Sequence, residues 1–213
     1  NLTSPKLEKK LPTVLSIDEV LKLLNSIEPN TPYEMRNEAM IELVYATGLR
    51  VSELVNLKLT NLHLTNKMIS TIGKGNKERL VPIGEKALQL LDLYIRNHRS
   101  KLKKIDQKCK DIVFLNRRGR KLTRQYVFLA IKTAAQQAEI KKNIHPHILR
   151  HSFASALVKG GANLIVVKEM MGHASVVSTE IYTHLDTTHL RETLMLYHPH
   201  YQNLNKKKSE ESQ

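Results

Sequence analysis

The chain has 213 residues, of which 41% are hydrophobic, enough for one domain with a substantial core. Its 34 Lys and Arg against 20 Asp and Glu leave a formal charge of +14, which favours a nucleic acid as partner over a merely basic surface. The single cysteine, Cys109, excludes a disulfide framework and a paired-cysteine metal site and fits a reducing compartment. No apolar run approaches the roughly 20 residues that span a bilayer, so no membrane partner is expected.

Residues 1–48 predict two helices after a basic stretch. Residues 1–14 are polar and basic, and a first residue other than Met indicates a fragment or a processed chain. Residues 16–19 read Ser-Ile-Asp-Glu, a capping box that predicts the start of the first helix. A second amphipathic helix is predicted over residues 32–46, and Gly48 ends it.

Arg50 follows this glycine at the start of a short predicted helix. The positive end of the helix dipole opposes a cation there, so the placement needs a reason. Glu53 lies three residues on and can hold Arg50 in a bidentate pair. A simple surface salt bridge would leave the same pattern.

The hydrophobic period changes between residues 61 and 83. Residues 67–72 and 79–83 predict two strands, and the turn residues 73–76 predict a hairpin with Lys74 near its bend. Lys74 can be an exposed decoration, or it can reach a DNA groove as a proton donor. With helices predicted on both sides, the fold class is mainly α with a small antiparallel β-hairpin or sheet (α+β).

A long helix over residues 84–98 and a short buried segment at 111–115 precede a basic turn at 117–121. Thr123 can cap the helix that follows and runs to about residue 138. Cations ahead of a helix N-terminus suit a DNA backbone, although such clusters are often only solvated. The expected DNA-binding residues are Lys77, Arg79, Arg117, Arg118, Arg120, Lys121 and Arg124.

The segment that follows carries most of the candidate catalytic residues. Pro146 fits the first turn of a helix, so His147, Arg150 and His151 fall on one face, opposite an apolar stripe. This polar edge is a platform for an anionic ligand, of which phosphate is the obvious candidate. Two histidines four residues apart can suggest zinc, but no HExxH glutamate lies between them, so no metal site is expected.

Two further helices are predicted after this one. Gly160-Gly161 end the long helix, and residues 163–171 form another, which Gly172 ends as a left-handed C′ residue that presents His173. A short helix then carries Tyr182.

Transfer of a phosphodiester to a protein hydroxyl needs a nucleophile, donors that stabilise the phosphorane and an acid for the leaving oxygen. Tyr182 is the best nucleophile, because a phosphotyrosyl linkage keeps most of the free energy of the diester. Arg50, Arg150 and His173 can stabilise the nonbridging oxygens.

Proton transfer has two candidates. His147 can take the phenolic proton, and Lys74 can protonate the departing 5′ oxygen. Each residue also has a plainer interpretation, with His173 as a helix-end residue and Tyr182 as a core tyrosine.

Five motifs together resemble the signature of the tyrosine recombinase, or phage-integrase-like, family, most closely its Xer type. They are ATGLRVSEL from residue 46, GKGNKER from residue 73, HILRH from residue 147, GH from residue 172 and IYTH from residue 181. The resemblance covers about residues 15–182 and implies the catalytic-domain fold of that family. It assigns six catalytic positions and a support for the first arginine: Arg50, Lys74, His147, Arg150, His173 and Tyr182, with Glu53 as the support.

Members of this family cut and rejoin DNA at short two-armed sites through a 3′-phosphotyrosine, with no metal or nucleotide cofactor. The resemblance therefore implies double-stranded DNA, a homo- or hetero-tetramer joined through C-terminal helices, and an activating partner protein. It also implies a nucleoid-associated location in a prokaryotic cytoplasm and a role in chromosome dimer resolution or mobile-element recombination. The implied plan is a linker from an upstream core-binding domain (1–14), a catalytic domain (15–184), an exchange helix (185–200) and a disordered tail (201–213).

Two alternatives stay open at this point. A type IB topoisomerase-like enzyme would share the nucleophile and the arginines but would not need a C-terminal exchange helix. A non-catalytic DNA-binding protein would use residues 162–171 in a helix-turn-helix and would require neither Tyr182 nor Lys74.

Overall fold

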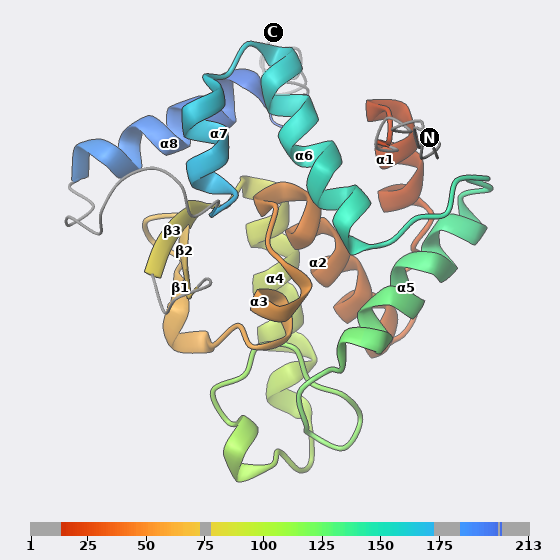
Figure 1. Ribbon diagram of the computed structural model, residues 1–213. Helices are drawn as coiled ribbons and strands as arrows, with labels where there is room; N and C mark the ends of the chain where they lie inside the picture. Colours follow the sequence, from red (N-terminus) through yellow and green to blue (C-terminus); the bar gives the residue numbers. More distant parts are fainter. Residues whose placement is uncertain (1–13, 73–77, 173–183, 200, 202–213) are drawn as a thin grey trace, which may run out of the picture.

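The computed structural model describes residues 14–72, 78–172, 184–199 and 201. It is mainly helical with a three-stranded antiparallel sheet in the order β1-β2-β3, as the sequence predicts (Figure 1). The helices are α1 (Ile17–Asn25), α2 (Pro32–Thr47), α3 (Val51–Val55), α4 (Glu85–Asn97), α5 (Arg124–Gln137), α6 (Pro146–Gly160), α7 (Leu164–Met170) and α8 (His184–Tyr197). The strands are β1 (Leu62–His63), β2 (Met68–Ile72) and β3 (Glu78–Pro82).

Helix ends lie where the capping residues predict them. The Ser16 hydroxyl accepts a hydrogen bond from the Glu19 amide at 3.2 Å, and the Glu19 carboxylate accepts one from the Ser16 amide at 2.7 Å, so the capping box is confirmed. Thr123 caps α5, and Pro146 is the first residue of α6. Gly48 ends α2 in the left-handed conformation. These signals act over a few residues and need no tertiary partner.

Helix α2 is the centre of the core. The prediction of a helix with one apolar side is wrong, because every residue from 39 to 47 is buried. Helix α2 packs against α4 and α6 and also contacts α1 and α3, so it is covered on several sides (Figure 1).

Strands β2 and β3 confirm the predicted hairpin, with Ile69 opposite Val81. Strand β1 pairs with β2 and completes the sheet. The turn between β2 and β3, residues 73–77, lies outside the described residues.

The C-terminal segment packs against its own chain. Helix α8 contacts α6, α7 and β3, and it begins at His184, earlier than the sequence indicates. Tyr201, expected at the start of a disordered tail, is only 6% exposed. A β-carbon on Gly84 would lie 1.3 Å from the Tyr201 ring, so this glycine provides the space for the aromatic side chain. No helix within the described ranges has the length and apolar character needed to cross a membrane.

We predict that Gly48→Ala destabilises the protein by about 2–5 kcal/mol. Gly48 has a φ of 62°, which costs a residue with a side chain about 1–2 kcal/mol, and its β-carbon would lie 2.6 Å from Phe153, which adds about 1–3 kcal/mol of overpacking. Urea unfolding measures the change. Gly161→Ala is the matched control, since Gly161 also has a positive φ but no contact closer than 3.4 Å. Equal losses in the two variants would contradict the predicted clash.

Candidate active site

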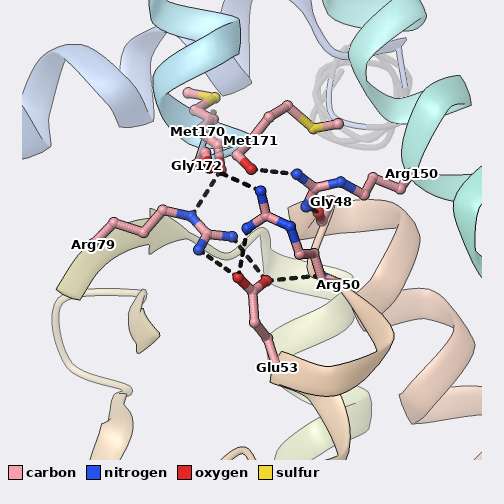
Figure 2. A network of polar contacts seen from close by, with 8 residues as sticks. All are labelled: Gly48, Arg50, Glu53, Arg79, Arg150, Met170, Met171 and Gly172. Carbon is pink, nitrogen blue, oxygen red and sulfur yellow. Dashed lines mark hydrogen bonds and ion pairs between the residues drawn. The ribbon is translucent and has the colours of Figure 1, made fainter. Parts of the chain in front are cut away.

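Three arginines from three distant elements meet at the C-terminal end of α7 (Figure 2). Each guanidinium donates to a different carbonyl oxygen there: Arg79 to Met170 at 3.1 Å, Arg150 to Met171, and Arg50 to Gly172 at 2.8 Å. The last carbonyls of a helix have no acceptor role inside it and carry the negative end of its dipole. The arginines therefore bind the end of α7 that leads directly to residue 173.

Glu53 links two of these arginines. Its carboxylate accepts both Nη atoms of Arg79, at 2.7 and 2.9 Å, and it accepts Nη1 of Arg50 at 2.9 Å and the Arg50 amide at 2.7 Å. The sequence correctly paired Glu53 with Arg50, but the expected bidentate geometry belongs to Arg79. Burial raises the pKa of the Glu53 carboxyl, yet hydrogen bonds and charge from Arg79, and then hydrogen bonds from Arg50, outweigh it, so the net pKa is lowered from 4.5.

Arg150 is buried, whereas the sequence placed it on an exposed polar edge of its helix. Its side chain is directed between the carbonyl oxygens of Gly48 and Met171 and is only 6% exposed. Burial, followed by the charge of Arg50, lowers the pKa of Arg150 to about 10, although Glu53 opposes that shift. The polar face predicted for α6 is therefore divided: Arg150 is buried, whereas His147 and His151 are exposed.

His147 lies on the exposed part of this face. It is the second residue of α6, is exposed, and precedes Arg150 by about one helical turn. The His147 ring lies 6.0 Å from the ring of His145, between centroids. Burial, followed by the charges of His147 and His151, lowers the pKa of His145.

Four predicted site residues, Lys74, Lys77, His173 and Tyr182, lie outside the described residues. The structure does describe Glu78, which follows Lys77, and Gly172, which precedes His173. Gly172 has a φ of 63°, as expected for a C′ residue, and immediately precedes His173.

A groove of about 680 Å³ opens beside Arg50. It runs between α3 and the sheet, and its lining includes Arg50, Glu53, Asn56, Lys58, Asn61 and Ser70. The Arg50 side chain is 29% exposed, so this guanidinium is reachable from the groove.

The basic turn has the exposure expected of a DNA-binding surface. The cations of the turn and the first residue of α5 are all exposed: Arg117, Arg118, Arg120, Lys121 and Arg124. The Asn116 side chain accepts the amides of Arg118 and Arg120, which fixes the turn. Lys121 donates to Asn56 at 3.0 Å and so places the turn next to the groove.

Among the expected DNA contacts that the structure describes, Arg79 is the exception. It is only 5% exposed, and its guanidinium is bound to Glu53 and Met170, so the expectation of a surface contact is corrected. Alternation along β3 places Arg79 on the same side as the buried Val81.

The chain matches the family model described as the phage integrase family over residues 13–189. The chain belongs to the phage integrase family. It is 46% identical over 195 residues to tyrosine recombinase XerD of Halalkalibacterium halodurans, covering 92% of this chain and 64% of that protein. It is also 46% identical over 198 residues to XerD of Listeria innocua, covering 93% of this chain and 66% of that protein. The chain thus spans just under two thirds of the length of these curated relatives.

Solved structures of recombinases agree with the fold. The XerA recombinase crystal structure superposes with a TM-score of 0.70 at 31% identity, covering 89% of this chain and 66% of that one. A pre-cleavage complex of XerH site-specific recombinase bound to difH substrate gives 0.69 at 32% identity, covering 78% and 48%. The resemblance to the Xer type and the catalytic-domain fold are confirmed.

In this phage integrase family chain, the sequence did not indicate that Arg79 binds Glu53 or that three carbonyl oxygens at the C-terminal end of α7 accept from arginines. Only Arg79 had a signal, since it alternates with Val81 and Ile83 on the apolar side of a predicted strand. Among the described residues, no group of three or more His, Cys, Asp or Glu side chains is placed to hold a metal ion. The expectation of catalysis without a metal stays a prediction.

We predict that Glu53→Gln destabilises the protein by about 3–5 kcal/mol at neutral pH, because it leaves Arg79 buried without its carboxylate. Since the folded-state pKa of Glu53 is lowered, its stabilisation is present above pH 4.5 and is lost as the pH falls below that value. The difference in the free energy of unfolding between wild type and Glu53→Gln should therefore become smaller as the pH falls below 4.5. Urea unfolding across this range measures it.

The control for this variant is Asp92→Asn, which removes an exposed ion pair with Arg96 and should cost less than about 1 kcal/mol. A stability difference between wild type and Glu53→Gln that is the same at every pH would contradict the prediction.

Proposed function

We propose that this chain is the catalytic part of a site-specific tyrosine recombinase of the Xer type, which cleaves and rejoins DNA through a 3′-phosphotyrosyl intermediate on Tyr182. The observation that carries the proposal is the charge at the end of α7. Three guanidinium groups meet there with one carboxylate, Glu53, which leaves an excess of two positive charges. A phosphodiester approaching its pentacoordinate transition state is the complementary ligand.

The two arginines of the predicted catalytic set have donors left for that ligand. A guanidinium carries five N–H donors, and the contacts of Arg50 and Arg150 to carbonyl oxygens use only some of them. Arg50 also lines the groove, which gives the phosphate a route to it. Both arginines would therefore bind the nonbridging oxygens while keeping the end of α7 in place.

The chemical step follows from the remaining assignments. The phenolic oxygen of Tyr182 attacks phosphorus and forms a P–O bond, while the bond from phosphorus to the 5′ oxygen breaks. His147 takes the phenolic proton, Lys74 protonates the departing 5′ oxygen, and His173 adds a donor to the phosphate. The reverse reaction by a 5′ hydroxyl reseals the strand.

The described surface supports a DNA partner. The basic turn lies next to the groove, and a relative is described as bound to a difH substrate. We assign residues 15–184 to catalysis and residues 185–200 to the helix exchanged between subunits of a DNA-bound homo- or hetero-tetramer. The upstream linker, an activating partner and action on a prokaryotic nucleoid belong to the same proposal.

A nicked suicide duplex tests the function. Wild-type protein should become covalently attached to the 3′ end of the cleaved strand, and Tyr182→Phe should bind the DNA without attachment. DNA binding without covalent product from wild type would instead support the non-catalytic DNA-binding alternative. Relaxation of supercoiled plasmid without strand exchange between two duplexes would support the topoisomerase-like alternative.

We predict that replacing Arg117 and Arg118 together by Gln weakens DNA binding and flattens its salt dependence. Each lost phosphate contact should reduce the slope of log K against log salt by about 0.9. Binding titrations at several salt concentrations measure the slope. Arg96→Gln is the control, since Arg96 is an exposed cation of α4 paired with Asp92 and should leave the slope unchanged. An unaltered slope in the double variant would remove the basic turn from the DNA interface.

A further inference from the structure

We propose that Arg79 is a positioning residue of the cleavage site, which fixes Glu53, and through it Arg50, against the end of α7. The inference rests on the proposed recombinase function, because its readout is DNA cleavage. It replaces the sequence-based expectation that Arg79 contacts DNA.

The contacts of Arg79 join two elements besides its own strand. Its two Nη atoms bind the two oxygens of Glu53 at 2.7 and 2.9 Å, which fixes the plane of the carboxylate on α3. Its Nε binds the Met170 carbonyl of α7 at 3.1 Å. A side chain that is 5% exposed and bound in these directions cannot rotate away without breaking several hydrogen bonds.

Gly172 lies against the same guanidinium. A β-carbon at Gly172 would be 3.0 Å from Cζ, Nε and Nη1 of Arg79, so the backbone packs closely on the Arg79 side chain. Gly172 also accepts the hydrogen bond from Arg50 and is followed by His173. The position of Arg79 therefore sets where the chain enters the predicted histidine.

Strand β3 gives Arg79 a third connection. Arg79 pairs with Thr71 across the hairpin and lies five residues after Lys74 in the chain. Through one side chain, β3 is tied to α3 and to the end of α7. Loss of Arg79 should thus displace Arg50 and the end of α7 together, while leaving the exposed basic turn in place.

The electrostatics of Glu53 give this role a specific readout. Among the described residues, the charged groups facing Glu53 are Arg50 at the N-cap of α3, Arg79 from β3 and Arg150 from α6. Burial raises the pKa of Glu53, and Arg79 is the strongest opposing influence. Without Arg79 the pKa of Glu53 should rise, and a protonated carboxyl can no longer accept both the guanidinium and the amide of Arg50.

The experiment measures single-turnover cleavage of the suicide duplex against pH, with DNA affinity measured in parallel. Arg79→Met should slow cleavage about 100-fold, the scale of a misplacement of about 1 Å, without weakening DNA binding. In Arg79→Met, the fall of the cleavage rate on acidification (the acid limb of the pH profile) should move to higher pH. Arg79→Lys keeps the charge but lacks the planar fork, so it should restore the acid limb and only part of the rate. Arg96→Met is the matched control, an exposed arginine paired with a carboxylate, and should behave like wild type.

The outcomes separate this inference from the proposed function. If wild type forms covalent product and Arg79→Met keeps a normal cleavage rate and acid limb, only the positioning role is overturned. The same holds if Arg79→Met loses cleavage rate in proportion to lost DNA affinity. Absence of covalent product from wild type overturns the proposed function and the positioning role with it. If Arg79→Met does not unfold cooperatively, Arg79→Lys decides: a slower rate with a retained acid limb supports the role, and a wild-type rate overturns it.

Discussion

The binding of guanidinium groups to the free carbonyl oxygens at the end of α7 is the interaction on which the site depends. Arg50 is the N-cap residue of α3, Arg79 lies in β3 and Arg150 in α6, and each donates to a different carbonyl at this helix end. A helix C-terminus offers these acceptors together with partial negative charge. Four separate elements are thus fixed relative to one another by one cluster of hydrogen bonds.

The positive charge of this cluster is only partly neutralised. Glu53 compensates one guanidinium and organises two, and the neutral carbonyls satisfy donors without cancelling charge. Burial, followed by the charges of Arg50 and Arg79, lowers the pKa of Arg150 to about 10, although Glu53 opposes the shift. The same excess that destabilises the free site would favour a phosphate within it.

A series of packed side chains connects the site to the C-terminal segment. Phe153 packs on Gly48, whose carbonyl accepts from Arg150, and the Phe153 ring lies 5.4 Å from that of the buried His198. His198 in turn lies 5.1 Å from Tyr201, between ring centroids. The residues after α8 are therefore part of the same core that supports Arg150, so the helix proposed for exchange and the arginine share packing neighbours.

The sequence by itself determined the features that depend on near neighbours: the capping box at Ser16, the helix end at Gly48, the hairpin, and the motifs that name the family. The pairing of Arg50 with Glu53 was also predictable, since the two are three residues apart. Only the tertiary structure decided that Arg79 is buried, that Arg150 faces inward and that Tyr201 packs in the core. The physical reason is distance along the chain. Caps and turns form within one or two helical turns, whereas Arg79 meets Met170 across 91 positions, and no local pattern encodes which carbonyl oxygens a distant helix end will offer.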